Sequence, residues 1–398
     1  MSPPSPDAPL RFLAVADTPA DASSGAAGTD LQTVLALRTL GHHVVDLWRD
    51  ALPHRIRHGN LHYAFELPGG YRKVVREHLE RAPFDVVLVS QPHGYLAARW
   101  VRRHAPASIF VNRSHGWEAH VEAALAPWRR RLCVPRWRFP RGILGRPLAR
   151  ILLRNCDRVA AASHGILVSA SACRDFIVAH HEVPPDRVAC IPQAPPDDYL
   201  AAAPPAWASR RPGSVLIVGG AGFVKGVDVS AQVIRACMAQ GLPLRFTWVA
   251  PATDHAALRA RLQGMSQECV AIQGNVPQAS LRDLYDAHQI LLFPSLVEGF
   301  GKAFLEAMAR GLCVVASDVG GMHDVIRSGT DGILCPAGDG AAFAAALRGL
   351  CAAPEEAERI GRAARATAEG YTWRRVAEET VGFCRVLLAR QRRGAGAP

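Results

Sequence analysis

Lysine is scarce in this chain of 398 residues. Only three lysines, Lys73, Lys225 and Lys302, stand among 46 lysines and arginines, and the formal net charge is +11. A basic chain of this kind is compatible with nucleic acid, an anionic membrane surface or an anionic substrate as partner. No nucleic-acid-binding motif accompanies the charge, so we expect no nucleic-acid partner.

Other signals that would assign a class are also missing. The ten cysteines form no CxxC pair and no metal-ligand spacing, which indicates reduced thiols in a cytoplasmic protein. No apolar run approaches the roughly 18 residues of a membrane span. The apolar run near the N-terminus is too short for a signal core and lacks a basic region before it.

Short apolar runs alternate with helical patterns, which is typical of an α/β protein with doubly wound parallel sheets. We expect a disordered segment at 1–9, a first Rossmann-like domain at 10–200 and a second one at 201–375, followed by a last helix within 376–398. The Pro- and Ala-rich stretch 194–213 is the expected linker. Within the first domain, strands are expected at 84–90, 107–111, 156–163 and 187–192.

Residues 290–311 carry the strongest local signal. The apolar run 290–293 predicts a buried strand, and a helical pattern runs from Gly301 to Gly311. Glu298 therefore lies at the carboxyl end of a strand, where open α/β sheets bind ligands. Lys302 and Glu306 share one helix face, and free amides at the helix start offer an anion site. A phosphorylated ligand with hydroxyl groups would suit this layout, whereas a surface ion pair beside a solvated acid is the simpler alternative.

A glycine loop follows the expected strand at 214–218. GlyGlyAlaGly at 219–222 is compatible with a dinucleotide site, but such a site needs an acid about 20 residues later. The next strand offers none before Asp254, so we expect no NAD and no other cofactor.

The stretch 290–324, with GlyPheGly between two glutamates and a later ValGlyGlyMetHisAsp, resembles the donor-binding signature of retaining glycosyltransferase family 4. The resemblance covers nearly the whole chain and is strongest over 214–335. It implies the two-domain GT-B fold, with two Rossmann-like domains facing a cleft and the last helix crossing back to the first domain. It also implies transfer of a sugar from a nucleotide-diphosphate donor to an acceptor hydroxyl, with retained configuration.

The same resemblance assigns roles to individual residues. Catalytic roles fall to His115 and Glu298. Donor binding falls to Gly219, Gly220, Lys225, Val276, Glu298, Gly299, Phe300, Gly301, Lys302 and Glu306. The acceptor side is assigned to Gly25, Gly28, His115 and Glu118. Relatives often carry arginine where this chain has Gly220, a departure that bears on diphosphate binding.

No metal is expected at the donor site, because Lys225, Lys302 and the helix amides can neutralise a leaving diphosphate and no DxD-like motif is present. Four histidines, His54, His58, His62 and His78, show no tight ligand spacing with acids, so they predict no metal site either.

The arginine-rich segment 128–154, with Trp128, Trp137 and Phe139 interleaved, is compatible with peripheral contact at the inner membrane face or with a solvated connector. Stacking on single-stranded nucleic acid is a rival interpretation of this segment. Relatives often act on glycan or lipid-linked acceptors in polysaccharide biosynthesis, which favours the membrane. Two alternative functions stay open: a nucleotide-sugar epimerase on the same fold, and a non-catalytic sugar- or membrane-binding relative.

Overall fold

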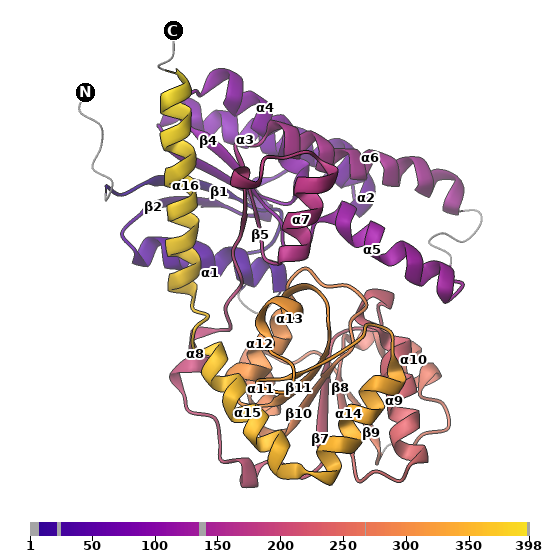
Figure 1. Cartoon of the computed structure of the whole chain (residues 1–398). Coiled ribbons are helices and arrows are strands. Elements are labelled where there is room, and N and C mark those ends of the chain that lie inside the picture. Colours follow the sequence, from indigo (N-terminus) through magenta and orange to yellow (C-terminus); the bar gives the residue numbers. More distant parts are fainter. Residues whose placement is uncertain (1–7, 22–24, 135–140, 267, 396–398) are drawn as a thin grey trace. The chain divides into compact units, whose positions relative to one another are not determined.

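The computed structural model describes residues 8–21, 25–134, 141–266 and 268–395. The chain divides into two units, residues 1–193 with 373–398, and residues 194–372. Each unit contains one sheet with helices packed on it (Figure 1). The segment 1–9, expected to be disordered, lies outside the described residues except for its last two. Among the described helices, none has the length and apolarity needed to cross a bilayer.

The first unit is built on six parallel strands in the order β2-β1-β3-β4-β5-β6. The strands are β1 (Arg11–Val15), β2 (His43–Leu47), β3 (Val86–Ser90), β4 (Ile109–Arg113), β5 (Gly165–Val168) and β6 (Val188–Cys190). The helices are α1 (Gly25–Thr39), α2 (Gly59–Leu61), α3 (Leu67–Arg81), α4 (Tyr95–His104), α5 (Glu118–Arg131), α6 (Arg141–Ala162), α7 (Ser171–His180) and α16 (Trp373–Ala395). A π-helical turn, His62–Glu66, joins α2 to α3.

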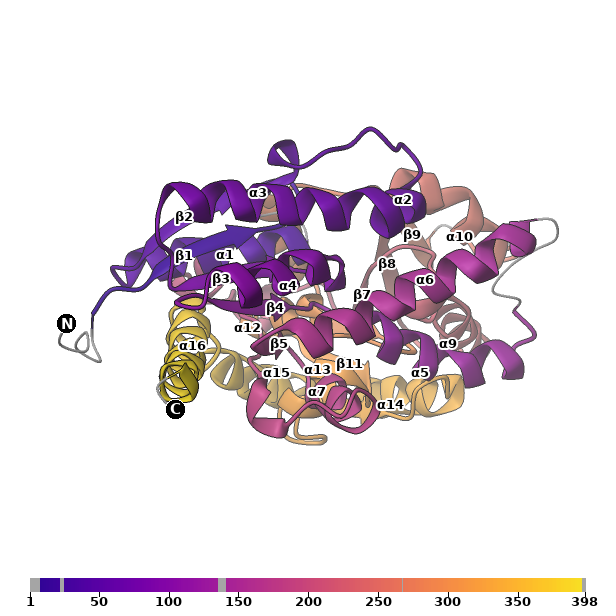
Figure 2. The ribbon, with the colours of Figure 1, turned by 90° about the horizontal axis from the view of Figure 1, so that it is seen from above.

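Helices cover both faces of this sheet, with α3 on one side and α16 on the other (Figures 1 and 2). Strands β3 and β4 are consequently buried along their whole length, as expected of interior strands in a parallel sheet. A Cβ at Gly165 would lie 2.4 Å from Leu387 Cδ1, so this glycine permits the close approach of α16 to β5. Further along α16, Gln391 Nε2 donates to the carbonyl of Pro106 at 2.6 Å.

One predicted strand is wrong. Residues 156–163 form the end of α6, and the strand β5 begins only at Gly165. Cys156, Val159 and Ala160 are buried at helical spacing, and alanine is the strongest helix former. A short alanine-rich apolar run is therefore ambiguous between helix and strand, and Ser163 follows a helix instead of a strand.

The second unit is also built on six parallel strands, in the order β12-β11-β10-β7-β8-β9. The strands are β7 (Ser214–Val218), β8 (Arg245–Val249), β9 (Val270–Gln273), β10 (Ile290–Phe293), β11 (Cys313–Ser317) and β12 (Ile333–Cys335). The helices are α8 (Asp197–Ala201), α9 (Val227–Ala239), α10 (His255–Arg261), α11 (Gln278–Ala287), α12 (Lys302–Ala309), α13 (Gly320–Val325), α14 (Gly340–Ala352) and α15 (Pro354–Ala368). The predicted α/β class with doubly wound parallel sheets is confirmed.

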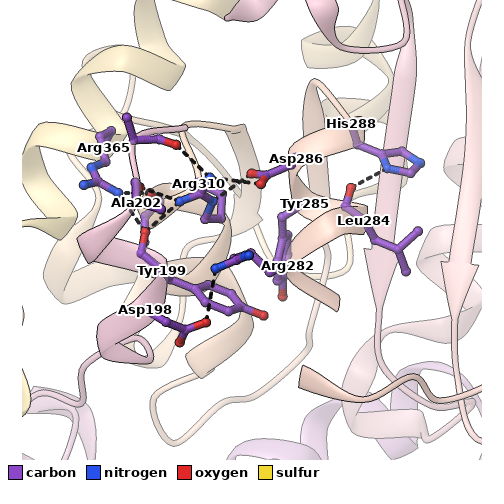
Figure 3. A network of polar contacts seen from close by, with 12 residues as sticks. Asp198, Tyr199, Ala202, Arg282, Leu284, Tyr285, Asp286, His288, Arg310 and Arg365 are labelled. Carbon is purple, nitrogen blue, oxygen red and sulfur yellow. Dashed lines mark hydrogen bonds and ion pairs between the residues drawn. The ribbon is translucent and has the colours of Figure 1, made fainter. Parts of the chain in front are cut away.

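Residues 194–213, expected to be a linker, are fastened to the second unit by arginines (Figure 3). The buried Arg310 pairs with Asp286 at 2.7 Å and donates to the carbonyl of Tyr199 at 2.9 Å. Arg365 donates to the same carbonyl at 2.8 Å. The carbonyl of Tyr199, in the short helix α8, thereby gains the donors that the next turn of a longer helix would supply.

We expect Arg310→Ala to lower the free energy of unfolding by about 3–5 kcal/mol, because it leaves Asp286 and buried carbonyls without their donor. Urea denaturation measures this change. Arg362→Ala is the matched control, since that side chain is 73% exposed and lies 3.9 Å from Glu358. Its effect should stay within about 0.5 kcal/mol. Equal losses in the two variants would contradict the assigned role of Arg310.

Candidate active site

The loop after strand β10 carries Glu298 to the carboxyl edge of the second sheet. This loop ends at Gly301, which precedes α12 with a φ of 89°. Positive φ is strained for residues with a Cβ, so glycine is required at this turn. Lys302 begins the helix directly after it, and the first amides of α12 have no partner within the helix.

Glu298 is the centre of a small polar cluster. Its side chain is 9% exposed, and its Oε1 atom accepts from Lys225 Nζ at 2.5 Å and from Ser295 Oγ at 2.8 Å. Lys225 comes from the turn after β7, and its ammonium also lies 5.6 Å from the centre of the Phe293 ring. Because Lys225 is 40% exposed, it can still reach a ligand at this edge.

The loops that carry these residues touch through their backbones. The amide of Leu296 donates to the carbonyl of Val224 at 2.8 Å. A Cβ at Gly226 would lie 1.9 Å from the carbonyl oxygen of Pro294, and one at Gly320 would lie 2.5 Å from that of Glu298. Side chains at these two glycines would therefore force the loops apart.

Lys302 and Glu306 form the second polar group of this edge. Their charged atoms are 3.6 Å apart and both side chains are largely buried, at 10% and 5% exposure. Tyr285 donates its hydroxyl to Glu306 Oε2 at 3.1 Å, and Gln278 Nε2 lies 3.5 Å from Oε1. Burial, followed by the nearby Glu306 charge, raises the pKa of Tyr285 well above its ordinary value. Glu306 is therefore buried and hydrogen-bonded. Lys302 and Glu306 are not the exposed surface pair that the simpler alternative predicted.

The glycine loop after β7 is pinned by Asp254. The amide of Ala221 donates to Asp254 Oδ2 at 2.8 Å, and a Cβ at Gly220 would lie 2.4 Å from that oxygen. Gly219 accepts from Trp248 Nε1 through its carbonyl at 2.9 Å. A side chain at position 220 would displace Asp254, so this loop has room only for glycine at that position.

The remaining predicted donor residues differ in how deeply they are buried. The side chain of Phe300 is buried in the core with Phe304, so only its backbone can face a ligand. Val276 is half-buried and packs against the same core, while Gly299 is half-buried in the β10 loop.

His115 follows strand β4 in the first unit and pairs with Asp30 of α1 at 3.0 Å. Burial acts to raise the pKa of Asp30, but the charges of His115 and Arg113 outweigh it and leave the pKa below its ordinary value. Arg113 is itself buried and donates to Thr33 at 2.6 Å. The other imidazole nitrogen, Nδ1, has no hydrogen-bond partner among the described residues.

Gly25 and Gly28 lie in the first turns of α1, not in the loop that the sequence suggested. Thr29 Oγ1 donates to the carbonyl of Gly25 at 2.8 Å and lies 3.1 Å from Gln193 Oε1. Gln193 thereby holds the start of α1.

The arginine-rich segment 128–154 spans the end of α5 and much of α6. Arg129 pairs with Glu122 at 2.7 Å, and the Arg131 guanidinium lies 5.6 Å from the centre of the Trp128 ring. Trp137 and Phe139 lie outside the described residues.

Sequence reasoning missed several partners of the predicted residues. Asp30 is 85 positions from His115, and Tyr285 belongs to the helix before β10. Neither position stands out in a pattern, because their roles come from the pairing of distant segments. Ser295 was visible as a polar residue at the strand end.

Residues 212–353 match the model of the family described as glycosyl transferases group 1. A D-inositol 3-phosphate glycosyltransferase of Streptomyces avermitilis is 26% identical over 363 residues, which cover 80% of this chain and 76% of that protein. Sucrose-phosphate synthase from Thermosynechococcus elongatus has a similar structure, with a TM-score of 0.73, 19% identity and coverage of 97% and 100% of the two chains. HepE from Anabaena, solved with UDP and glucose, gives a TM-score of 0.64, 15% identity and coverage of 94% and 98%.

Two α/β domains, each built on a six-stranded parallel sheet, give the chain the GT-B fold. Residues 212–353 carry a glycosyl transferases group 1 domain, and the chain is a glycosyltransferase. The predicted GT-B fold and enzyme class are confirmed, and the resemblance to this glycosyltransferase family is confirmed over residues 212–353.

Glu118, the first residue of α5, makes the stability of the first unit depend on pH. Burial raises the pKa of Glu118 to about 7, and Cys156 Sγ lies 3.9 Å from its carboxylate. A raised carboxyl pKa means that the folded state binds more protons than the unfolded state between about pH 4.3 and the folded pKa. Wild-type stability therefore falls as pH rises through this window.

We expect Glu118→Gln to remove this pH dependence, because the amide cannot ionise. Relative to wild type, the variant should gain about 1–2 kcal/mol in free energy of unfolding between pH 5 and pH 8, discounted because the side chain is only half-buried. Urea denaturation at the two pH values measures the gain. A difference that does not change with pH would contradict the raised pKa.

Proposed function

We propose that the protein transfers a sugar from a nucleotide-diphosphate sugar to an acceptor hydroxyl with retained anomeric configuration. The observation that carries the proposal is the grouping of Lys225, Glu298, Lys302 and Glu306 at the end of strand β10. Two carboxylates and two ammonium groups at the carboxyl edge of a parallel sheet suit a ligand with both hydroxyls and phosphates.

On the donor side, Lys225, Lys302 and the first amides of α12 would neutralise the charge that develops on the departing diphosphate. Glu298 would hold a hydroxyl of the transferred sugar, and Glu306 the ribose. Since these groups are positioned by backbone contacts, they need no metal to assemble them. The leaving phosphate would itself accept the acceptor's proton, so no protein nucleophile is required.

On the acceptor side, the buried Asp30 holds His115 at the end of β4 in one orientation. The imidazole can then contact the transferred sugar or the acceptor hydroxyl. The acceptor we propose is a glycan, a lipid-linked sugar or a small polyol. A relative named for D-inositol 3-phosphate supports the last of these.

We also propose a cytoplasmic setting, which the ten cysteines present as thiols support. Contact with an anionic membrane surface through the segment 128–154 would bring the enzyme to a lipid-linked acceptor.

The alternative function, a nucleotide-sugar epimerase, is distinguished from a transferase by an assay without acceptor, because an epimerase would still form product.

Thermal unfolding with UDP, GDP, ADP and their common sugars tests donor binding. One nucleotide at 100 times its dissociation constant should add about 2.7 kcal/mol of stability, which raises Tm measurably. The shift caused by the nucleotide should be the same with and without EDTA. A nucleotide shift that disappears in EDTA would contradict metal-independent binding, and no shift with any nucleotide would contradict the donor site.

Glu298→Gln should lower kcat by roughly 10²–10³-fold, because it weakens a preorganised contact to the sugar at the reacting centre. Turnover is followed as release of nucleoside diphosphate from the sugar nucleotide that stabilises the protein. Glu355→Gln, which changes an exposed carboxylate on α15, should leave turnover unchanged. Unaltered turnover in Glu298→Gln would remove Glu298 from the site.

A further inference from the structure

Three potential metal ligands from separate segments converge at the carboxyl end of β1. They are Asp17, two residues after that strand, His54 and His62, and their ligand atoms all lie within 4.8 Å of one another. Asp17 Oδ1 is 3.0 Å from His54 Nε2, and Asp17 Oδ2 is 3.4 Å from His62 Nε2. The spacing of His54 and His62 in the sequence does not indicate a metal site. The fold brings them together with Asp17, which lies 37 positions before His54.

The facing atoms of these three side chains are buried without hydrogen-bond partners in the part of the chain that the structure describes. Asp17 Oδ1, His54 Nε2 and His62 Nε2 are buried and have no hydrogen-bond partner among the described residues. The Nδ1 atom of His62 lies 2.9 Å from Glu66 Oε2, and a carboxylate can only accept, so Nδ1 carries the hydrogen. In the neutral ring, Nε2 then presents a lone pair to the carboxylate of Asp17. Two acceptors that face each other are stabilised by a cation between them.

Glu66 also fixes the segment that carries His54. Its carboxylate accepts from the amides of Arg55 and Ile56, both at 3.0 Å. The His54 and His62 rings stack at 4.6 Å between centroids, so both imidazoles are oriented before any ligand arrives. A carboxylate behind a liganding imidazole is the usual outer contact of metal-bound histidine. The π-helical turn His62–Glu66 is a further sign of a functional position.

We propose that Asp17, His54 and His62 bind one divalent transition metal ion of the Zn²⁺ type. Bonds of about 2.0–2.1 Å in a tetrahedral site separate neighbouring ligand atoms by about 3.3–3.4 Å. His54 lies 3.0 Å from one oxygen of Asp17 and His62 lies 3.4 Å from the other, both close to that value, and the ligand atoms of the whole cluster lie within 4.8 Å of one another. Two imidazoles favour Zn²⁺, Co²⁺ or Ni²⁺ over Mg²⁺ and Ca²⁺, which prefer oxygen ligands.

Three protein ligands leave a fourth position for water or for an oxygen of a bound molecule. The His54 side chain is 27% exposed, although its Nε2 atom is buried. Strands β1, β3 and β4 are neighbours in the sheet, which places the metal site on the same edge as His115. The site stands independently of the proposed transfer reaction, since it uses no residue of the second unit.

Metal binding is tested on tag-free, metal-stripped protein by calorimetric titration with Zn²⁺ and by thermal unfolding. One equivalent should bind, and His54→Ala and Asp17→Asn should each weaken that binding by 10-fold or more. His58→Ala is the matched control, because this neighbouring histidine is exposed and lies outside the cluster. Mg²⁺ at the same concentration should leave Tm unchanged.

Co²⁺ supplies a second readout that separates this site from the cysteines. Its spectrum should show nitrogen and oxygen ligation without a thiolate charge-transfer band. Absence of a one-equivalent site, equal binding by His54→Ala and wild type, a thiolate band, or an equal Tm shift with Mg²⁺ would each overturn the proposal. The nucleotide-induced Tm shift of the donor site is measured separately, so each idea can fail alone.

Discussion

The second domain depends on backbone contacts that leave no room for a side chain. Gly226 after β7 lies against the carbonyl of Pro294 after β10, and Gly320 after β11 lies against that of Glu298. Strands β11, β10 and β7 are neighbours and parallel, so their three loops share one edge of the sheet. The loops are locked together before a ligand binds, and the polar groups they carry are thereby preorganised.

Arginine and lysine have separate uses in this basic chain. Arg310 and Arg365 satisfy backbone carbonyls of the segment that enters the second domain, a task suited to a planar group with five donors. The point charges of Lys225 and Lys302 instead lie beside carboxylates at the ligand edge. Two of the three lysines therefore lie at the predicted ligand edge, while arginines supply both surface charge and internal support.

Much of the fold was predictable because its strands are short apolar runs bounded by glycines. The positions of Glu298, Lys302 and Glu306 followed from a strand, a turn and a helical spacing within one segment. The alanine-rich run 156–163 misled, because its pattern suits a helix as well as a strand. Asp30 and the Asp17 cluster were out of reach, since only the pairing of distant segments brings these side chains to His115 and to the histidines. The roles of the site residues remain predictions.

The scarcity of lysine makes the protein convenient for chemical labelling. Side-chain exposure falls from 70% at Lys73 to 40% at Lys225 and 10% at Lys302. An amine-selective reagent therefore meets a largely exposed side chain at Lys73 on α3. At the β10 edge it meets a partly exposed side chain, Lys225, and a nearly buried one, Lys302. Loss of modification at Lys225 relative to Lys73 would report occupancy of that edge within a single digest, with Lys73 as the internal reference.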